Sequence, residues 1–337
     1  MERKNCLLSN RGVIKLELIN TPKECETINT IIEGLPDDLL ICAGSPEIRC
    51  LGIAKRLAQN YKAKNILLIR YSGHQSEERE RNIRELKNRL QNVGNIDEII
   101  IDEENPIPRI REITAKIETY SSKPIARITI DITTIIKWHL LILLESLDLC
   151  NLAKTCRFVY TEPEDYMTDI FIPLSFGINK VFPVPTYSGN FDFYKDLQLI
   201  IMLGYEGDRA SAVFEEMDPD DCLLLIAKPS YHEKSWEGRT ERLNKEIINI
   251  VGESKIRYID ARNPILVKQQ LDDLLSNPKA RRFNHAIAPL GTKPQTLGLY
   301  AYLRNKPRNT IVVYGSPARH NKFYSQGIGR SWILPFQ

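Results

Sequence analysis

The sequence predicts an α/β protein made of two copies of one Rossmann-like unit, with mainly parallel sheets and a pseudo-two-fold relation between the copies. Short apolar runs alternate with segments of helical period along the 337 residues, a pattern typical of βαβ units and a parallel sheet. The same motifs also occur in the same order in both halves of the chain, about 150 to 160 residues apart. We place the first unit, with an N-terminal extension, at residues 1–188 and the second at 189–337, because residues 183–190 are rich in Pro, Gly and Ser.

The repeat rests on several motif pairs. In the first pair, an apolar run ends at Gly44 or Gly204, and Arg49 or Arg209 follows five residues later. In the second pair, the apolar run 66–69 matches 223–226. In the third, Asp102, Asn105 and Pro106 match Asp260, Asn263 and Pro264. In the last two, Tyr160 and Pro163 match Tyr314 and Pro317, and Gly177 matches Gly327. Any two Rossmann-like units share strands that end in glycine, which would account for the first pair but not for the last. The constant order therefore indicates an internal duplication.

The apolar runs predict five strands in each unit. They are 39–43, 65–70, 98–102, 127–132 and 157–160 in the first unit, and 199–203, 222–227, 255–260, 284–289 and 310–314 in the second. Helices are predicted at 52–61, 79–90, 209–217 and 296–303. Before the first unit, residues 12–20 alternate like an edge strand, and 22–34 resemble a helix with Pro near its start and Gly at its end.

Composition limits the functional classes. The chain is 42% hydrophobic and 26% charged with a net charge of +3, so it carries no direct nucleic-acid signature, although an anionic small ligand is compatible with it. No apolar stretch approaches the roughly 20 residues of a membrane span, and no secretory signal is visible. The seven cysteines show no C-x-x-C spacing, so we expect no disulfide framework, no metal site and a cytoplasmic location. Nothing indicates a cofactor.

The loops after the first strand of each unit are candidates for ligand binding, because parallel α/β sheets bind ligands at the carboxyl ends of their strands. Gly44 and Gly204 would allow a tight turn, with Ser45 beside the first of them. Arg49 and Arg209 would lie in the first turn of the next helix and reach a phosphate or a carboxylate. In the alternative interpretation, each arginine pairs with a neighbouring acid, such as Glu47 or Glu206, as part of the scaffold.

The clearest anion-binding signal is the turn that contains Gly291, Thr292, Lys293 and Gln295. It joins a predicted strand to a helix, so it presents backbone N–H groups and the positive end of the helix dipole. It is not a P-loop, because G-x-x-x-x-G-K-[ST] is absent. A plain helix start with a solvated lysine is the alternative.

Gly291-Thr292-Lys293 after a strand of a Rossmann-like unit resembles the G-T-K loop of CARF domains, the CRISPR-associated Rossmann-like sensors that bind cyclic oligoadenylates between two pseudo-symmetric copies. The resemblance covers this loop and the overall layout. It implies a nucleotide pocket between the two halves, contacted by Thr292 and Lys293, and a role in prokaryotic antiviral defence. The corresponding loop of the first unit has Thr133 in place of glycine and no lysine at the matching position, so we expect an asymmetric ligand rather than a strictly two-fold one.

Three functions remain open from the sequence. The leading one is a cytoplasmic sensor or accessory subunit that binds a nucleotide-type ligand and acts through a separate effector protein or a homo-oligomer. The second is a nucleotide-processing hydrolase or transferase in which Glu206 and Asp208 act as acid and base, with Asp260 and Tyr314 around the same pocket. The third is a structural subunit of a multi-protein complex.

Overall fold

The computed structural model describes most of the chain. The described residues are 26–28, 36–73, 76–121, 127–150, 152, 156–166, 174–230, 238–304, 309–321 and 324–336. Among them, no helix has the length and apolar character needed to cross a lipid bilayer.

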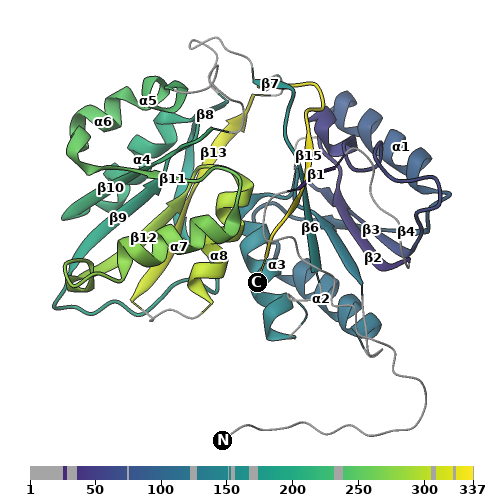
Figure 1. Cartoon of the computed structure of the whole chain (residues 1–337), viewed down its shortest axis with the longest axis horizontal. Helices are drawn as coiled ribbons and strands as arrows, with labels where there is room; N and C mark the ends of the chain where they lie inside the picture. Colours follow the sequence, from purple (N-terminus) through teal and green to yellow (C-terminus); the bar gives the residue numbers. More distant parts are fainter. Residues whose placement is uncertain are drawn as a thin grey trace, which may run out of the picture.

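Two large, mainly parallel sheets lie side by side, one in each half of the molecule (Figure 1). The first has the order β1-β15-β6-β5-β2-β3-β4, from strands β1 (Glu26–Ile28), β2 (Asp37–Ala43), β3 (Ala63–Tyr71), β4 (Asn95–Ile101), β5 (Ile128–Asp131), β6 (Cys156–Thr161) and β15 (Ser331–Leu334). The second has the order β11-β10-β9-β12-β13-β8, from β8 (Ser175–Pro183), β9 (Asp196–Met202), β10 (Asp221–Ala227), β11 (Ile256–Ile259), β12 (Phe283–Pro289) and β13 (Thr310–His320). The α/β class and all ten predicted strands are therefore confirmed.

The five parallel strands of each sheet follow the same order. In chain order within each half, the strands lie as third, second, first, fourth and fifth. Parallel strands covered on both faces read as continuous apolar runs, which is why β2 and β9 are so apolar. The switch in strand order lies between the first and fourth strands, where ligands bind in sheets of this kind.

The last strand of each half belongs to the sheet of the other half. β8 follows β6 in the chain but pairs antiparallel with β13, and β15 follows β13 but pairs antiparallel with β6. Between them, β7 (Asp165–Tyr166) and β14 (Ser325–Gln326) form a two-stranded antiparallel ribbon that lies between the two halves in Figure 1. The division of the chain after residue 188 stays a prediction, and each sheet takes one strand from across it.

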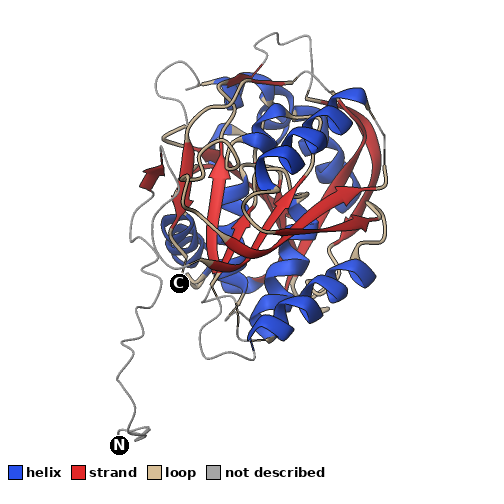
Figure 2. Cartoon of the chain, turned by 90° about the vertical axis from the view of Figure 1, so that its right-hand side faces the viewer, coloured by secondary structure: helices blue, strands red, loops and turns tan. Residues whose placement is uncertain are grey.

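Helices cover both faces of the sheets, as the side view shows (Figure 2). In the first half they are α1 (Glu77–Leu90), α2 (Ile107–Ser121) and α3 (Lys137–Leu149), and in the second α4 (Gly207–Met217), α5 (Arg239–Leu243), α6 (Lys245–Val251), α7 (Pro264–Leu275) and α8 (Lys293–Leu303). The predicted helices at 79–90, 209–217 and 296–303 are confirmed.

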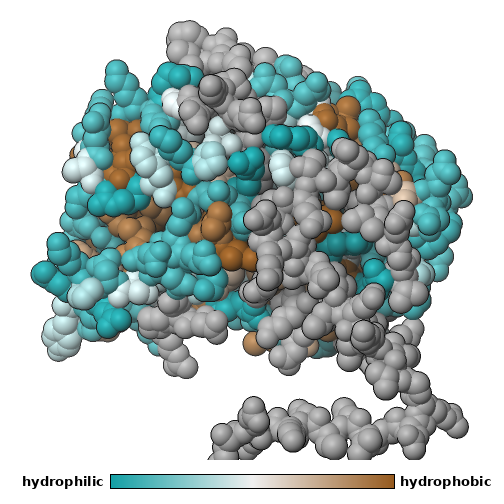
Figure 3. Space-filling model, viewed as in Figure 1, coloured by the Kyte–Doolittle hydropathy of each residue, from teal (hydrophilic) through white to brown (hydrophobic). Residues whose placement is uncertain are grey.

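One apolar core joins the two halves. It combines side chains of both sheets with α2, α3, α7 and α8, while two smaller cores lie under α1 and under α4 and α6. At its centre α3 packs against α8, and Arg304 after α8 forms a bidentate pair with Asp148 of α3 at 2.5 and 2.9 Å. On the face shown in Figure 3, hydrophobic residues show in small groups between hydrophilic ones, so the apolar side chains are concentrated inside.

Two local predictions were wrong. Residues 52–61 form no α-helix but irregular turns that follow a 3-10 helix η1 (Ile48–Leu51). Tertiary contacts override the helical pattern here, since Arg56 donates to the Gly329 carbonyl at 2.6 Å. In the predicted helix at 22–34, the described residues are the strand β1, which pairs with the exchanged strand β15. The predicted edge strand at 12–20 lies outside the described residues.

Candidate functional site

A cavity of about 590 Å³ lies between the two halves, where the loops after the parallel strands of both sheets meet. This volume falls within the range of small-molecule sites, roughly 300–1,000 Å³. Most residues that the sequence singled out line it: Gly44, Ser45, Arg49, Gly204, Glu206, Arg209, Gly291, Thr292, Lys293 and Tyr314. The duplicated loops therefore face one common space.

The two first-strand glycines are needed for space rather than for an unusual backbone conformation. Neither Gly44 nor Gly204 is among the described glycines with positive φ. A Cβ atom at Gly204 would lie 2.4 Å from the carbonyl oxygen of Leu290, and one at Gly44 would lie 2.5 Å from a side-chain carbon of Ile83. The tight turn that the sequence predicts is in fact a close approach between neighbouring chain segments.

We expect Gly204→Ala to lower the free energy of unfolding by about 1–3 kcal/mol, the usual cost of overpacking. The new methyl group would push against a backbone carbonyl, which cannot rotate away as a side chain can. Urea unfolding followed by circular dichroism measures the change. Gly177→Ala is not a suitable control, because Gly177 has φ +60 and an alanine there would strain the backbone. Ala212→Ser, a small substitution on the neighbouring helix α4, is the control. An unchanged midpoint for Gly204→Ala would contradict the packing argument.

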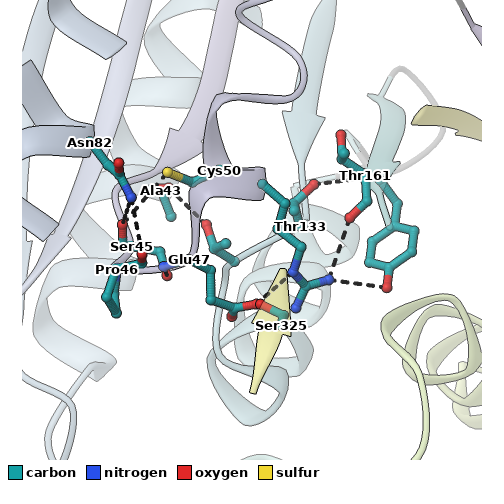
Figure 4. A network of polar contacts seen from close by, with 12 residues as sticks. Ala43, Ser45, Pro46, Glu47, Cys50, Asn82, Thr133, Thr161 and Ser325 are labelled. Atoms are coloured by element: carbon teal, nitrogen blue, oxygen red, sulfur yellow. Dashed lines mark hydrogen bonds and ion pairs between the residues drawn. The ribbon is translucent and has the colours of Figure 1, made fainter. Parts of the chain in front are cut away.

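Arg49 and its partner Glu47 link the first loop to β6 and β14, and Figure 4 shows the surrounding polar network, with Glu47, Thr161 and Ser325 labelled. Its guanidinium donates to Glu47 at 2.6 Å, to the Tyr160 hydroxyl at 3.2 Å and to the Thr161 carbonyl at 3.4 Å. Burial alone would raise the pKa of Glu47, but the charge and hydrogen bond of Arg49 outweigh burial and lower it to about 2. Ser325 of β14 also donates to Glu47, at 2.9 Å.

Arg209 is held in the same way in the second half. It forms a close ion pair with Glu206 and donates two hydrogen bonds to the Gly315 carbonyl, at 3.0 and 2.7 Å. Its guanidinium lies 5.2 Å from the ring centre of Tyr314. Each arginine thus pairs with a neighbouring acid, as the scaffold interpretation predicts, and each also lines the cavity.

Two asparagines that sequence reasoning left without a role fix the first loops. Asn82 of α1 donates to the carbonyls of Ser45 and Pro46 at 3.0 and 3.1 Å, and Asn244 donates to the Gly204 carbonyl at 2.8 Å. Both asparagines follow the second strand of their unit, at corresponding places in the repeat. Their repetition was the signal that could have identified them.

In the Gly291-Thr292-Lys293 turn, most polar atoms are used by the scaffold. Thr292 and Gln295 form a capping box at the start of α8. The Thr292 hydroxyl also donates to Ala261 O at 2.8 Å, and the Gln295 amide donates to Asp260 O at 3.0 Å. Gln295 is buried behind the turn and does not line the cavity, so Lys293 remains the functional group of this turn that faces it.

A second lysine, which the sequence comparison missed, faces the same space. Lys137 is the first residue of α3, as Lys293 is the first residue of α8. Its ammonium donates to the carbonyl oxygen of Leu290, from the other half, at 2.8 Å. In the first unit the lysine lies two positions later than its counterpart in the second, which is why the aligned loops showed no match.

Neither lysine forms an ion pair with a carboxylate within the described part of the chain. Lys293 makes no hydrogen bond or ion pair there, and Lys137 has only the Leu290 carbonyl. Burial and the positive charge of nearby arginines lower the pKa of Lys293 to about 8 and that of Lys137 well below its ordinary value, although nearby carboxylates, Glu206 among them, act in the opposite direction. Two ammonium groups at two helix N-termini therefore line one cavity without an ion-paired carboxylate in the described residues, and an anionic ligand would complement them.

The predicted pair of catalytic carboxylates is not assembled at the cavity. Glu206 lines it but is committed to Arg209, while Asp208 is exposed on α4 and does not line it. Asp260 accepts hydrogen bonds from the backbone of Arg262 and Asn263. Among the described residues, no three His, Cys, Asp or Glu side chains are placed to hold a metal ion.

Comparison with protein-family models and with curated proteins finds no match to this chain.

Proposed function

We propose that the cavity between the two halves binds an anionic, nucleotide-type ligand, and that the protein is a cytoplasmic sensor or accessory subunit for it. The observation that carries the proposal is the pair of lysines, Lys137 and Lys293, which line the cavity without an ion-paired carboxylate in the described residues. The described lining carries six Arg and Lys side chains against four Glu side chains, and an excess of positive charge in a partly buried site is costly unless a counter-charge is supplied. A phosphate group between two helix N-termini supplies it.

The rest of the lining favours a nucleotide over a bare inorganic anion. The cavity is far larger than one phosphate, and tyrosines contribute much of its wall. Aromatic rings offer flat faces on which a nucleobase stacks. The resemblance of the Gly291-Thr292-Lys293 loop to CARF domains adds a role in antiviral defence to the proposal, acting through a separate effector protein or a homo-oligomer.

Native mass spectrometry of the full chain, purified from its host without denaturant, tests the proposal. We expect a bound species whose released mass and fragments identify a phosphorylated nucleoside compound. A protein that carries no ligand, and that takes up none from a mixture of nucleotides, would contradict it.

The same mixture separates binding from catalysis. Incubation with excess labelled nucleotide should return the nucleotide unchanged, because Glu206 is paired with Arg209 and Asp208 lies outside the cavity lining. Products that form with repeated turnover would instead support the enzyme, and assembly with a partner protein in the absence of any ligand would support the structural subunit.

Ligand affinity is expected to fall as the pH rises above about 8. Lys293 is protonated below its pKa of about 8 and loses its charge above it, so binding an anion at higher pH requires a proton, and affinity falls by up to about tenfold per pH unit. Lys137, whose pKa is also lowered, adds charge as the pH falls. Isothermal titration with ADP between pH 7.5 and 9.5 measures this, because the phosphate's own ionisation near pH 6 is then complete. Lys293→Ala should flatten the profile above pH 8, and a flat wild-type profile would contradict the assignment.

A further inference from the structure

β8 and β15 each pair with the sheet of the other half. This exchange of strands creates two equivalent places at the cavity, which we call its corners. In one, β7 pairs with β14, with Tyr166 opposite Ser325. In the other, the end of β13 pairs with the start of β8, with His320 opposite Ser175. The two pairings are related by the offsets that relate the repeats. Ser325 lies 150 residues after Ser175, and His320 lies 154 residues after Tyr166. Residues can therefore be compared between corners position by position.

One corner is built from tyrosines. We call Tyr166, Tyr205 and Tyr324 the tyrosine corner; all three line the cavity. The rings of Tyr166 and Tyr324 are nearly parallel, at 12° with 6.2 Å between centroids, and Tyr205 meets Tyr166 edge to face at 5.3 Å. They come from three separate segments of the chain, β7, the loop after β9 and the residue before β14.

The tyrosine rings are fixed by their neighbours. The Arg239 guanidinium lies 5.4 Å from the ring centre of Tyr205 and donates to the Tyr166 carbonyl at 3.4 Å. Tyr324 hydrogen-bonds to Glu47, which Arg49 holds in turn. Aromatic faces held in place before binding lose little conformational entropy when a ligand stacks on them.

The equivalent corner has different residues. The positions that correspond to Tyr205, Tyr324 and Tyr166 are Ser45, Leu174 and His320. Ser45 and Leu174 line the cavity together with Phe176. The guanidinium of the exposed Arg319 lies 4.8 Å from the centre of the Phe176 ring. The lysines come from both halves, but Tyr166, Tyr205 and Tyr324 lie together in one corner only.

We propose that the tyrosine corner is a subsite for a single nucleobase, and that the ligand is an asymmetric, linear nucleotide with its phosphates at Lys137 and Lys293. This inference rests on the proposed function and specifies its ligand. A two-fold symmetric ligand would place identical groups in the two corners, so that one base would stack on the three tyrosines and the other would meet Leu174, Ser45 and a Phe176 ring that already contacts the Arg319 guanidinium. A linear nucleotide with one base places its planar group where the stacking faces are.

Isothermal titration of the full chain tests the subsite with three probes: ADP, cyclic di-AMP and inorganic pyrophosphate. The double variant Tyr205→Ser and Tyr324→Leu gives the tyrosine corner the residues of the other corner, and Phe176→Leu is the matched control there. We expect the double variant to bind ADP at least about tenfold more weakly, because stacked bases depend on their aromatic partners. Pyrophosphate should bind the double variant as it binds the wild type, which also shows that the fold and the lysines are intact.

The outcomes separate the inference from the proposed function. Weaker ADP binding with unchanged pyrophosphate binding, no effect of Phe176→Leu, and tighter binding of ADP than of cyclic di-AMP would support the subsite. Unchanged ADP binding by the double variant, or tighter binding of cyclic di-AMP with equal losses from both corners, would overturn it while nucleotide binding stands. If none of the three probes binds, the proposed function itself fails.

Discussion

Replacement of Arg209 by alanine is expected to lower the free energy of unfolding by about 3–5 kcal/mol, the usual cost of removing one partner of a buried ion pair. Arg209 is 3% exposed. Its loss leaves the Glu206 carboxylate without its partner and takes away the two hydrogen bonds to the Gly315 carbonyl. Chemical unfolding monitored by circular dichroism measures the difference.

A matched control is Arg257→Ala. Arg257 is exposed and, among the described residues, donates only to the nearby carbonyls of Ser254 and Ile256, so its removal should change stability by less than about 0.5 kcal/mol. If Arg209→Ala lowered the free energy of unfolding by less than about 1 kcal/mol, the Arg209–Glu206 pair would not be what stabilises the loop after β9.

The double variant Lys137→Ala and Lys293→Ala is expected to bind an anionic ligand at least about 100-fold more weakly. Each charge-assisted hydrogen bond contributes about 1.5–3 kcal/mol, and each 1.4 kcal/mol is about tenfold in affinity. Titration with pyrophosphate measures the loss directly, and ADP extends it to a nucleotide.

The stability of this double variant should be unchanged or higher than that of the wild type, because two partly buried ammonium groups that form no ion pair in the described residues are removed. This distinguishes a binding role from a structural one. Lys268→Ala on α7, where the lysine pairs with Asp272 at the surface, should leave binding intact. Wild-type affinity in the double variant would refute the assignment of the lysines.

Much of the fold could be predicted from the sequence because the strands of a parallel sheet are apolar on both faces. The apolar runs at β2 and β9 are typical of buried parallel strands, and the repeated order of motifs located the remaining strands. The exchange of β8 and β15 could not be predicted, since a hydrophobic pattern shows that a strand exists but not which sheet it joins. The same applies to β1, whose pairing depends on the exchanged β15.

The site could be predicted where its residues belong to the repeat or to a turn typical of anion sites. Arg49 and Arg209 follow strands at places that the duplication marks, Lys293 lies in a strand-to-helix turn, and all three line the cavity. Lys137 was missed because it is displaced in the aligned loop. Tyr166 and Tyr324 were missed because they lie at the crossovers, where only the three-dimensional structure brings them to the cavity.

The structure places the asymmetry of the cavity in different residues from those that the sequence indicates. The sequence predicts an asymmetric ligand because the first unit lacks a lysine at the matching position, yet Lys137 brings an ammonium group to the cavity from that unit. The two lysines that we propose to bind the anion thus come from both halves. The asymmetry lies instead in the tyrosine corner.

Both halves should hold one anion between Lys137 and Lys293, and crystals soaked with tungstate, an electron-rich mimic of phosphate, would reveal it. We expect an anomalous difference peak inside the cavity within hydrogen-bonding distance of both ammonium groups, and its loss in the double lysine variant. A cavity without a peak, in crystals that bind tungstate elsewhere, would contradict it.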